Sequence, residues 1–128
     1  MGNKVFINKD HLIETVYVGV QTASTIRQIA HRTAELAKKL QQQERPVLIL
    51  VDLRQLHHVT LDGRATASRV LGEIPYQGIA VYGATIFLKH LINLIARATD
   101  RRNKIQTFSS RESAVQWLKQ LVKPAPQL

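Results

Sequence analysis

Hydrophobic residues near the start of the chain follow two periods in succession. The segments KVFIN and HLIETVYVGV, separated by Lys9-Asp10, are rich in β-branched and aromatic residues, which predicts two strands joined by a tight turn. From Ser24 the apolar positions recur every three or four residues, which predicts an amphipathic helix capped by Thr22 or Ser24 and ended by Pro46. Its predicted buried face comprises Ile26, Ile29, Ala30, Thr33, Leu36, Ala37 and Leu40.

The next apolar run, Val47–Leu53, shows no alternation and is typical of a strand covered on both faces of a parallel sheet. Helical and strand patterns then alternate. A helix begins at Thr60 or Asp62 and ends near Gly72, and it is followed by the strand GIAVYG, the helix ATIFLKHLINLIARAT and the strand KIQTF.

A last helix is predicted from a capping box of Ser109 and Glu112. Its apolar stripe is Ala114, Trp117, Leu118 and Leu121. We expect Trp117 to be largely buried against the sheet, beside Phe108.

The resulting order, two strands followed by alternating helices and strands, predicts an α/β domain with a mainly parallel sheet. Within it, Val47–Val51 and Ile79–Val81 are expected to be adjacent, buried, parallel strands. We expect one domain over residues 1–122 and a flexible tail at 123–128, where two prolines stop the last helix. The pattern leaves the order of the strands open.

Composition narrows the function classes. The chain of 128 residues has no cysteine, which excludes disulfides, thiolate zinc sites and cysteine catalysis. No run approaches the roughly 18 apolar residues of a membrane span, and the first residues lack the apolar core of a signal peptide. We therefore expect a cytoplasmic protein.

Charge is the other unusual feature, with 18 basic and 9 acidic residues and a formal net charge of +9. The basic residues are spread along the chain, and the closest clusters are Lys38-Lys39 and Arg101, Arg102, Lys104. Aromatic residues make up only 5% of the chain, and no basic and aromatic platform for stacking bases is visible. The pattern disfavours nucleic-acid binding and favours solvated basic faces.

The segment Arg54–Arg64 is predicted to be a loop that follows the central strand, at the edge where α/β sheets bind ligands. It offers Arg54, His57, His58 and Arg64 around one carboxylate, Asp62. Adjacent histidines diverge in an extended segment, and no metal-ligand spacing is present, so we expect no metal, no cofactor and no catalytic group here. We interpret the segment as a surface that binds a protein partner.

The third predicted helix carries a broad apolar arc: Phe87, Leu88, Leu91, Ile92, Leu94 and Ile95. Most of this arc is expected to pack on the sheet. Ile86 falls on the polar side together with His90, so Ile86, Phe87 and His90 are candidates for contact with an apolar ligand or a second copy of the chain. The helix start at Gly83-Ala84-Thr85 offers free amides to an anion, but no phosphate-binding loop is present.

In order and spacing, these segments resemble STAS domains of the anti-sigma-factor-antagonist type, the SpoIIAA-like family. The resemblance rests on VLILVDLRQLHHVTLDGRATASRVL, on IAVYGATIFLKHLINLIA and on the closing residues Phe108, Glu112, Ala114, Trp117 and Leu118. It implies a SpoIIAA-like topology with roughly five strands and four helices, a fold also likened to CRAL-TRIO lipid carriers.

One position departs from that family. Its antagonists carry a phosphorylatable serine directly before a glycine, and aligning that glycine with Gly63 places Asp62 at the serine position, after Thr60 and Leu61. No serine is available for a phosphorylation switch, which leaves Thr60 as the nearest hydroxyl. Asp62 is interpreted as a helix cap, and a carboxylate there also mimics part of the charge of a phosphate.

The sequence thus supports two hypotheses from different classes. The first is a non-catalytic STAS-like regulatory or scaffold module that binds a protein partner through Arg54–Arg64 and the following helix. The second is a small carrier or sensor of an apolar, lipid-like ligand, held between the third helix and the sheet. Self-association into a homodimer stays open under both.

Overall fold

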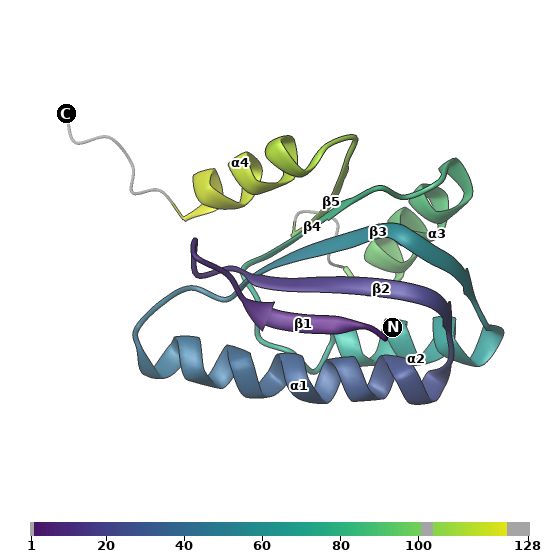
Figure 1. The fold of residues 1–128 in the computed structure, drawn as a ribbon, viewed down its shortest axis with the longest axis horizontal. Coiled ribbons are helices and arrows are strands. Elements are labelled where there is room, and N and C mark those ends of the chain that lie inside the picture. Colours follow the sequence, from purple (N-terminus) through teal and green to yellow (C-terminus); the bar gives the residue numbers. More distant parts are fainter. Residues whose placement is uncertain (1, 101–103, 123–128) are drawn as a thin grey trace.

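The computed structural model describes residues 2–100 and 104–122. Five strands and four helices occur in this part of the chain, in the predicted order (Figure 1). They are β1 (Lys4–Ile7), β2 (Ile13–Gln21), α1 (Ala23–Gln42), β3 (Leu48–Val59), α2 (Leu61–Leu71), β4 (Gly78–Tyr82), α3 (Ile86–Ala98), β5 (Ile105–Phe108) and α4 (Arg111–Leu121).

The strands form one sheet in the order β1-β2-β3-β4-β5, which is also their order along the chain. Strand β1 pairs antiparallel with β2, and the other pairs are parallel. Ile49 lies opposite Ile79 and Val51 opposite Val81, so the prediction of two adjacent, parallel central strands is confirmed. The α/β class and the opening hairpin are confirmed as well.

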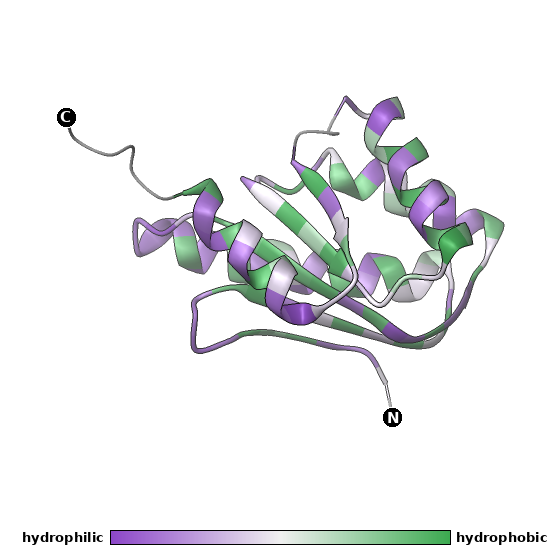
Figure 2. Cartoon of the chain, turned by 90° about the horizontal axis from the view of Figure 1, so that it is seen from above, coloured by the Kyte–Doolittle hydropathy of each residue, from purple (hydrophilic) through white to green (hydrophobic). Residues whose placement is uncertain are grey.

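Helices cover both faces of this sheet (Figure 1). Side chains alternate between the faces along each strand, so Leu48 and Leu50 of β3 face α4, whereas Ile49 of the same strand faces the helices on the other side. Seen from above, hydrophobic segments run along the central strands and hydrophilic segments mark the outward turns of the helices (Figure 2).

Under α4 the core is small and closely packed. Ala114 and Leu118 of α4 are fully buried against the strand residues Leu50 and Ala80. The rings of Phe108 and Trp117 lie 5.6 Å apart, as predicted, but Trp117 is partly rather than largely buried, because it packs at the border of this small cluster.

The opposite face carries the larger core cluster. Helix α1 buries the predicted stripe except for Ala30, which is partly exposed. Its cap is Thr22, whose hydroxyl accepts a hydrogen bond from the Thr25 N–H at 3.3 Å while the Thr25 hydroxyl accepts one from the Thr22 N–H at 2.9 Å. Both of these orphan donors of the helix start are thereby satisfied.

The expected loop at Arg54–Arg64 is wrong in its first half. Strand β3 continues through Val59, because β2 runs beside it as far as Gln21 and supplies backbone hydrogen-bond partners. The register shifts twice along this pair, beside Val16–Val18 and Gly19–Val20 of β2, and each shift places one extra residue in β3. A polar strand that is supported on one side only does not show the apolar run by which buried strands are recognised.

Two helix caps also differ from expectation. Thr60, not Asp62, caps α2 by accepting a hydrogen bond from the Gly63 N–H at 3.2 Å. Ser110, not Ser109, caps α4 by accepting one from the Ser113 N–H at 3.2 Å. In both places more than one neighbouring polar residue has a side chain that can cap the helix, and the path of the preceding strand determines which residue becomes the cap.

The single domain predicted for residues 1–122 stays a prediction, and the tail predicted at 123–128 lies outside the described residues, as do Arg101 and Arg102. No helix in the described part of the chain has the length and hydropathy needed to cross a membrane.

Candidate functional site

The carboxyl ends of β2 and β3 meet the starts of α2 and α3 at one edge of the sheet. Thr60 joins the ends of the two strands, because its N–H donates to the carbonyl oxygen of Gln21 at 3.0 Å. Most of the residues singled out in the sequence lie along this edge. The carboxyl edge, as we call it, comprises the end of β3 from Arg54, the first turn of α2 and the first turn of α3.

Arg54 is committed to an internal partner. Its Nε and Nη2 donate to the two carboxylate oxygens of Asp52 at 3.1 and 2.9 Å, and its guanidinium lies 5.3 Å from the centre of the Tyr82 ring. Burial opposes ionisation of Asp52, yet the hydrogen bonds and charge of Arg54 outweigh it and hold the pKa of the carboxyl below its usual value. The charge of Arg54 is therefore largely neutralised by Asp52, and Arg54 is less available to a partner than we expected from the sequence.

His57 and His58 are both exposed on the extended end of β3. His58 lies opposite Val20 of β2, and adjacent side chains on a strand point to opposite sides. Within residues 2–100 and 104–122, no three histidine or acidic side chains gather into a group that could hold a metal ion. The histidines are available for contact with a partner.

Asp62 and Thr60 form a local hydrogen-bonded pair. The Thr60 hydroxyl donates to the Asp62 carboxylate while it accepts from the Gly63 N–H. The Thr60 hydroxyl is the main cause that lowers the pKa of Asp62, with smaller effects from the N–H groups of Gly63 and Ala23 and from the charge of Arg27. Asp62 thus belongs to the hydrogen-bonded start of α2.

Arg64 is placed differently from Arg54. Its Nε donates to the carbonyl oxygen of Val59 at 3.3 Å, and its guanidinium lies 5.3 Å from the centre of the Phe87 ring, which brings the start of α2 against the start of α3. Within the described chain no carboxylate pairs with it. Arg64 is therefore a cation without a neutralising partner.

Large apolar side chains are exposed at the starts of the same two helices, α2 and α3. Leu61 is 80% exposed, Ile86 is 75% exposed and Phe87 is 60% exposed. The exposure of Ile86 agrees with its predicted place on the polar side of the helix. Of the apolar arc, of which most was expected to pack on the sheet, Phe87 and Leu94 are exposed. His90, one turn further along α3, is exposed too.

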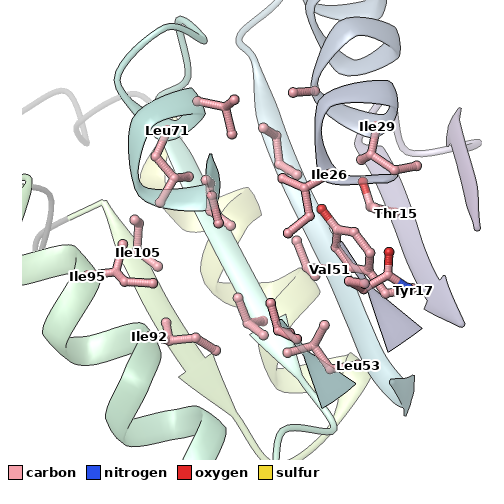
Figure 3. Close-up of a pocket in the computed structure, with 18 of the residues that line it drawn as sticks. Thr15, Tyr17, Ile26, Ile29, Val51, Leu53, Leu71, Ile92, Ile95 and Ile105 are labelled. Carbon is pink, nitrogen blue, oxygen red and sulfur yellow. The ribbon is translucent and has the colours of Figure 1, made fainter. Parts of the chain in front are cut away.

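A cavity of about 200 Å³ lies directly behind this surface, between the sheet and the helices α1, α2 and α3. In Figure 3, Tyr17 and Val51 of the sheet lie near Ile26 of α1, and Ile92 and Ile95 of α3 face them across the space. The lining also includes Ala67 and Leu71 of α2, Leu53, Leu56 and Val59 of β3, and Leu88 and Leu91 of α3.

The cavity exists because α3 covers the sheet without closing on it. Of the residues of α3, only Ala96 is buried. Leu88, Leu91, Ile92 and Ile95 are partly buried and line the cavity. From the sequence, a ligand pocket between α3 and the sheet was only the alternative hypothesis. The part that α1 and β2 play in its lining was not predicted, because their apolar residues have the pattern of ordinary core residues.

The polar groups of the lining are few. The Gln21 side chain exchanges hydrogen bonds with Asn3 at 2.7 and 3.0 Å, and the Thr33 hydroxyl donates to the carbonyl oxygen of Ile29 at 2.8 Å. Burial raises the pKa of the Tyr17 phenol to about 12, so that it stays neutral at any physiological pH. The interior therefore suits hydrocarbon, and among the residues that the structure describes Arg64 is the one charged side chain of the lining.

The start of α3, considered above for anions, is built around its own cap. The Thr85 hydroxyl accepts a hydrogen bond from the Leu88 N–H at 3.2 Å. Gly83 has a positive φ of 80°, and a Cβ there would lie 2.9 Å from the backbone nitrogen of Arg54. Gly83 is thus required for the turn that lets α3 leave the sheet.

Comparison with solved structures defines the class of the fold. The chain is similar to an uncharacterized protein of the DUF3478 family with a SpoIIAA-like fold from Shewanella loihica PV-4, with 18% identity and a TM-score of 0.68 over 91% of this chain and 94% of that one. It is also similar to the anti-sigma factor antagonist SpoIIAA in its unphosphorylated form, with 9% identity and a TM-score of 0.62 over 92% of this chain and 98% of that one. The fold is therefore SpoIIAA-like, of the STAS type, as the resemblance in the sequence predicted.

The family is also defined. Residues 15–122 match the family described as Domain of unknown function (DUF7793), and the chain belongs to it. A comparison with curated proteins gives no match.

Proposed function

We propose that this protein is a non-catalytic, STAS-like regulatory or scaffold module that binds an acidic protein partner at the carboxyl edge. The observation that carries the proposal is the exposure of Leu61, Ile86 and Phe87 at the starts of α2 and α3, where the unpaired cation Arg64 contacts Phe87. Apolar side chains gathered on a surface and rimmed by polar groups are typical of protein interfaces.

Charge argues for the chemistry of the partner. The carboxyl edge offers Arg64, His57 and His58, while the charge of Asp62 is engaged by neighbouring donors. The whole chain carries a net charge of +9, which favours encounter with an acidic surface. An acidic face with apolar side chains at its centre would complement this edge.

A regulatory switch by phosphorylation is not part of the proposal. The solved SpoIIAA is described in an unphosphorylated form. The resemblance to anti-sigma-factor antagonists puts Asp62 at the position of their phosphorylatable serine, and the hydroxyl of Thr60 is engaged by both Asp62 and Gly63. A carboxylate fixed at this place supports a module that binds its partner constitutively in a cytoplasmic setting.

The test is an affinity purification from native cells, followed by titration of the captured partner with variants. Arg64→Glu should weaken binding about tenfold or more, because it reverses a charge inside the contact area. Ile86→Ser should weaken it as well, by removing an apolar contact. Lys38→Glu, an equal charge reversal on the exposed side of α1, is the matched control and should change affinity little. Equal affinities of Arg64→Glu, Asp62→Ala and the unaltered protein would remove this edge from the interface.

A second function is favoured by a separate observation, the apolar cavity of about 200 Å³. The protein would then carry or sense a small apolar ligand held between α3 and the sheet. A native mass spectrum of the purified protein should show a retained small molecule. Ala67→Leu should abolish that mass increment, because it fills space at the wall of the cavity.

A further inference from the structure

We infer that the cavity binds a single-chain amphiphile with an anionic head, of the class of medium-chain carboxylates, and that Arg64 holds the head. This inference deepens the second function proposed above and rests on it. It joins two features that lie next to each other: a hydrocarbon-lined interior, and the unneutralised guanidinium of Arg64, a lining residue whose guanidinium contacts the exposed Phe87 ring at the surface.

The interior selects a hydrocarbon tail. Its lining consists mainly of isoleucine, leucine and valine side chains from the sheet and from the helices α1, α2 and α3. Of its polar side chains, Gln21 and Thr33 already hydrogen bond within the protein, and Thr15, Tyr17 and Tyr76 add one hydroxyl each to a lining of more than twenty residues. A ligand group that needed several hydrogen bonds would find few partners here and would lose those it made with water.

Arg64 selects the head group. The side chain is partly buried, and its Nε donates a hydrogen bond to Val59. Its two terminal nitrogens make no hydrogen bond with the described residues. The guanidinium fork matches a carboxylate or a phosphate with two parallel hydrogen bonds. The contact with the Phe87 ring, 5.3 Å from the guanidinium, restricts the Arg64 side chain and lowers the entropy that binding would cost.

The size of the cavity guides the choice of the probe. If each chain carbon occupies about the 30 Å³ of a water molecule, a space of about 200 Å³ holds roughly seven of them. Octanoate, which has seven carbons in addition to its carboxylate carbon, is therefore the probe of choice. A phosphate head would accept the same two hydrogen bonds from the guanidinium, so a comparison with octyl phosphate shows whether the head is a carboxylate or a phosphate.

The experiment is a calorimetric titration of the full chain with octanoate, octyl phosphate, 1-octanol and octylammonium. We expect octanoate to bind about tenfold tighter than octanol and octylammonium to bind weakest, because a charge-assisted hydrogen bond is worth about one order of magnitude in affinity. Octyl phosphate binding tighter than octanoate would assign the head to a phosphate and overturn the carboxylate.

Arg64→Gln should bind octanoate and octanol equally. Arg69→Gln is the matched control, since Arg69 lies exposed on the same helix outside the cavity lining, and it should keep the preference. Circular dichroism confirms that each variant is folded. A loss of preference in both variants would mean general charge attraction and would overturn the role of Arg64.

Failure of the inference is separable from failure of the second function. If octanol and octanoate bind the unaltered protein equally, the cavity is a ligand site and Arg64 does not select the head. If no probe binds the folded protein and Ala67→Leu behaves like it, the cavity binds no such ligand and both proposals are wrong.

Discussion

Helices α3 and α4 cover opposite faces of the same sheet and pack in opposite ways. Helix α3 is the more apolar of the two, yet only Ala96 of its 13 residues is buried. Helix α4 is shorter, and two of its own residues, Ala114 and Leu118, are fully buried against the sheet. The hydrophobicity of a helix thus does not determine how closely the helix packs on the sheet.

The difference arises from the strands and the charges below each helix. Gly78 and Ala80 present little or no side chain to α4, and a Cβ at Gly78 would lie 2.4 Å from a methyl carbon of Leu121. Ion pairs tie α4 to the β1–β2 hairpin: Arg111 to Glu14 at 2.9 Å and Lys119 to Asp10 at 3.3 Å. Within the described residues α3 takes part in no ion pair, and β-branched residues such as Ile79 and Val81 lie on its side of the sheet.

Cavity-creating substitutions should separate the two helices most strongly. Leu118→Ala under α4 should lower the free energy of unfolding by about 2–5 kcal/mol, because a fully buried leucine leaves a void that close packing cannot fill. Leu91→Ala in α3 should cost less than about 1 kcal/mol, because that side chain already borders empty space. Denaturant titration measures both, and equal losses would show that the two faces are packed alike.

Adding volume should have opposite signs on the two faces. Gly78→Ala should destabilise by about 1 kcal/mol, the lower end of the range for overpacking, because the new methyl group meets the end of the Leu121 side chain, which is exposed enough to move aside. Ala67→Leu should leave stability unchanged or raise it by about 0.5–1 kcal/mol, because the added carbons enter the cavity. Thermal unfolding of both variants provides the comparison, and a destabilised Ala67→Leu would indicate that the cavity cannot accept three more carbons.

The pair of Asp52 and Arg54 predicts a pH dependence on the α4 side. Because the pKa of Asp52 is lowered in the folded state, its contribution to stability is fully present above the unfolded value of about 4 and is lost as the pH falls through the lower folded pKa. Asp52→Asn should therefore be less stable than the unaltered protein at pH 7 and should lose less stability between pH 5 and pH 3. Parallel pH profiles of the two proteins would contradict this.

The smallest effects are expected on the carboxyl edge, which belongs to neither packed core. Arg64→Glu should change the free energy of unfolding by only about 0.5 kcal/mol, since the side chain has no carboxylate partner to lose. Chemical denaturation at pH 7 checks this value. A much larger loss would show that the contact of Arg64 with Phe87 holds α3 in place, and would change how the binding tests are interpreted.

Much of the fold follows from the sequence alone. The unbroken apolar run around Leu50 required a strand buried on both faces, and the spacing from Ile26 to Leu40 required a helix with one buried side. These signals are local, because each depends on residues within one element. The order of the elements and the parallel pairing of β3 with β4 could therefore be predicted.

Other features were decided only by the tertiary structure. Strand β3 extends through His57 and His58 because β2 runs alongside, and Arg64 stacks on Phe87 because α2 and α3 start at the same edge. The cavity depends on the distance between α3 and the sheet, which is set by side chains from several elements at once. Sequence patterns record which side chains are apolar, but whether two apolar surfaces meet or leave a space between them is a property of their shapes in three dimensions.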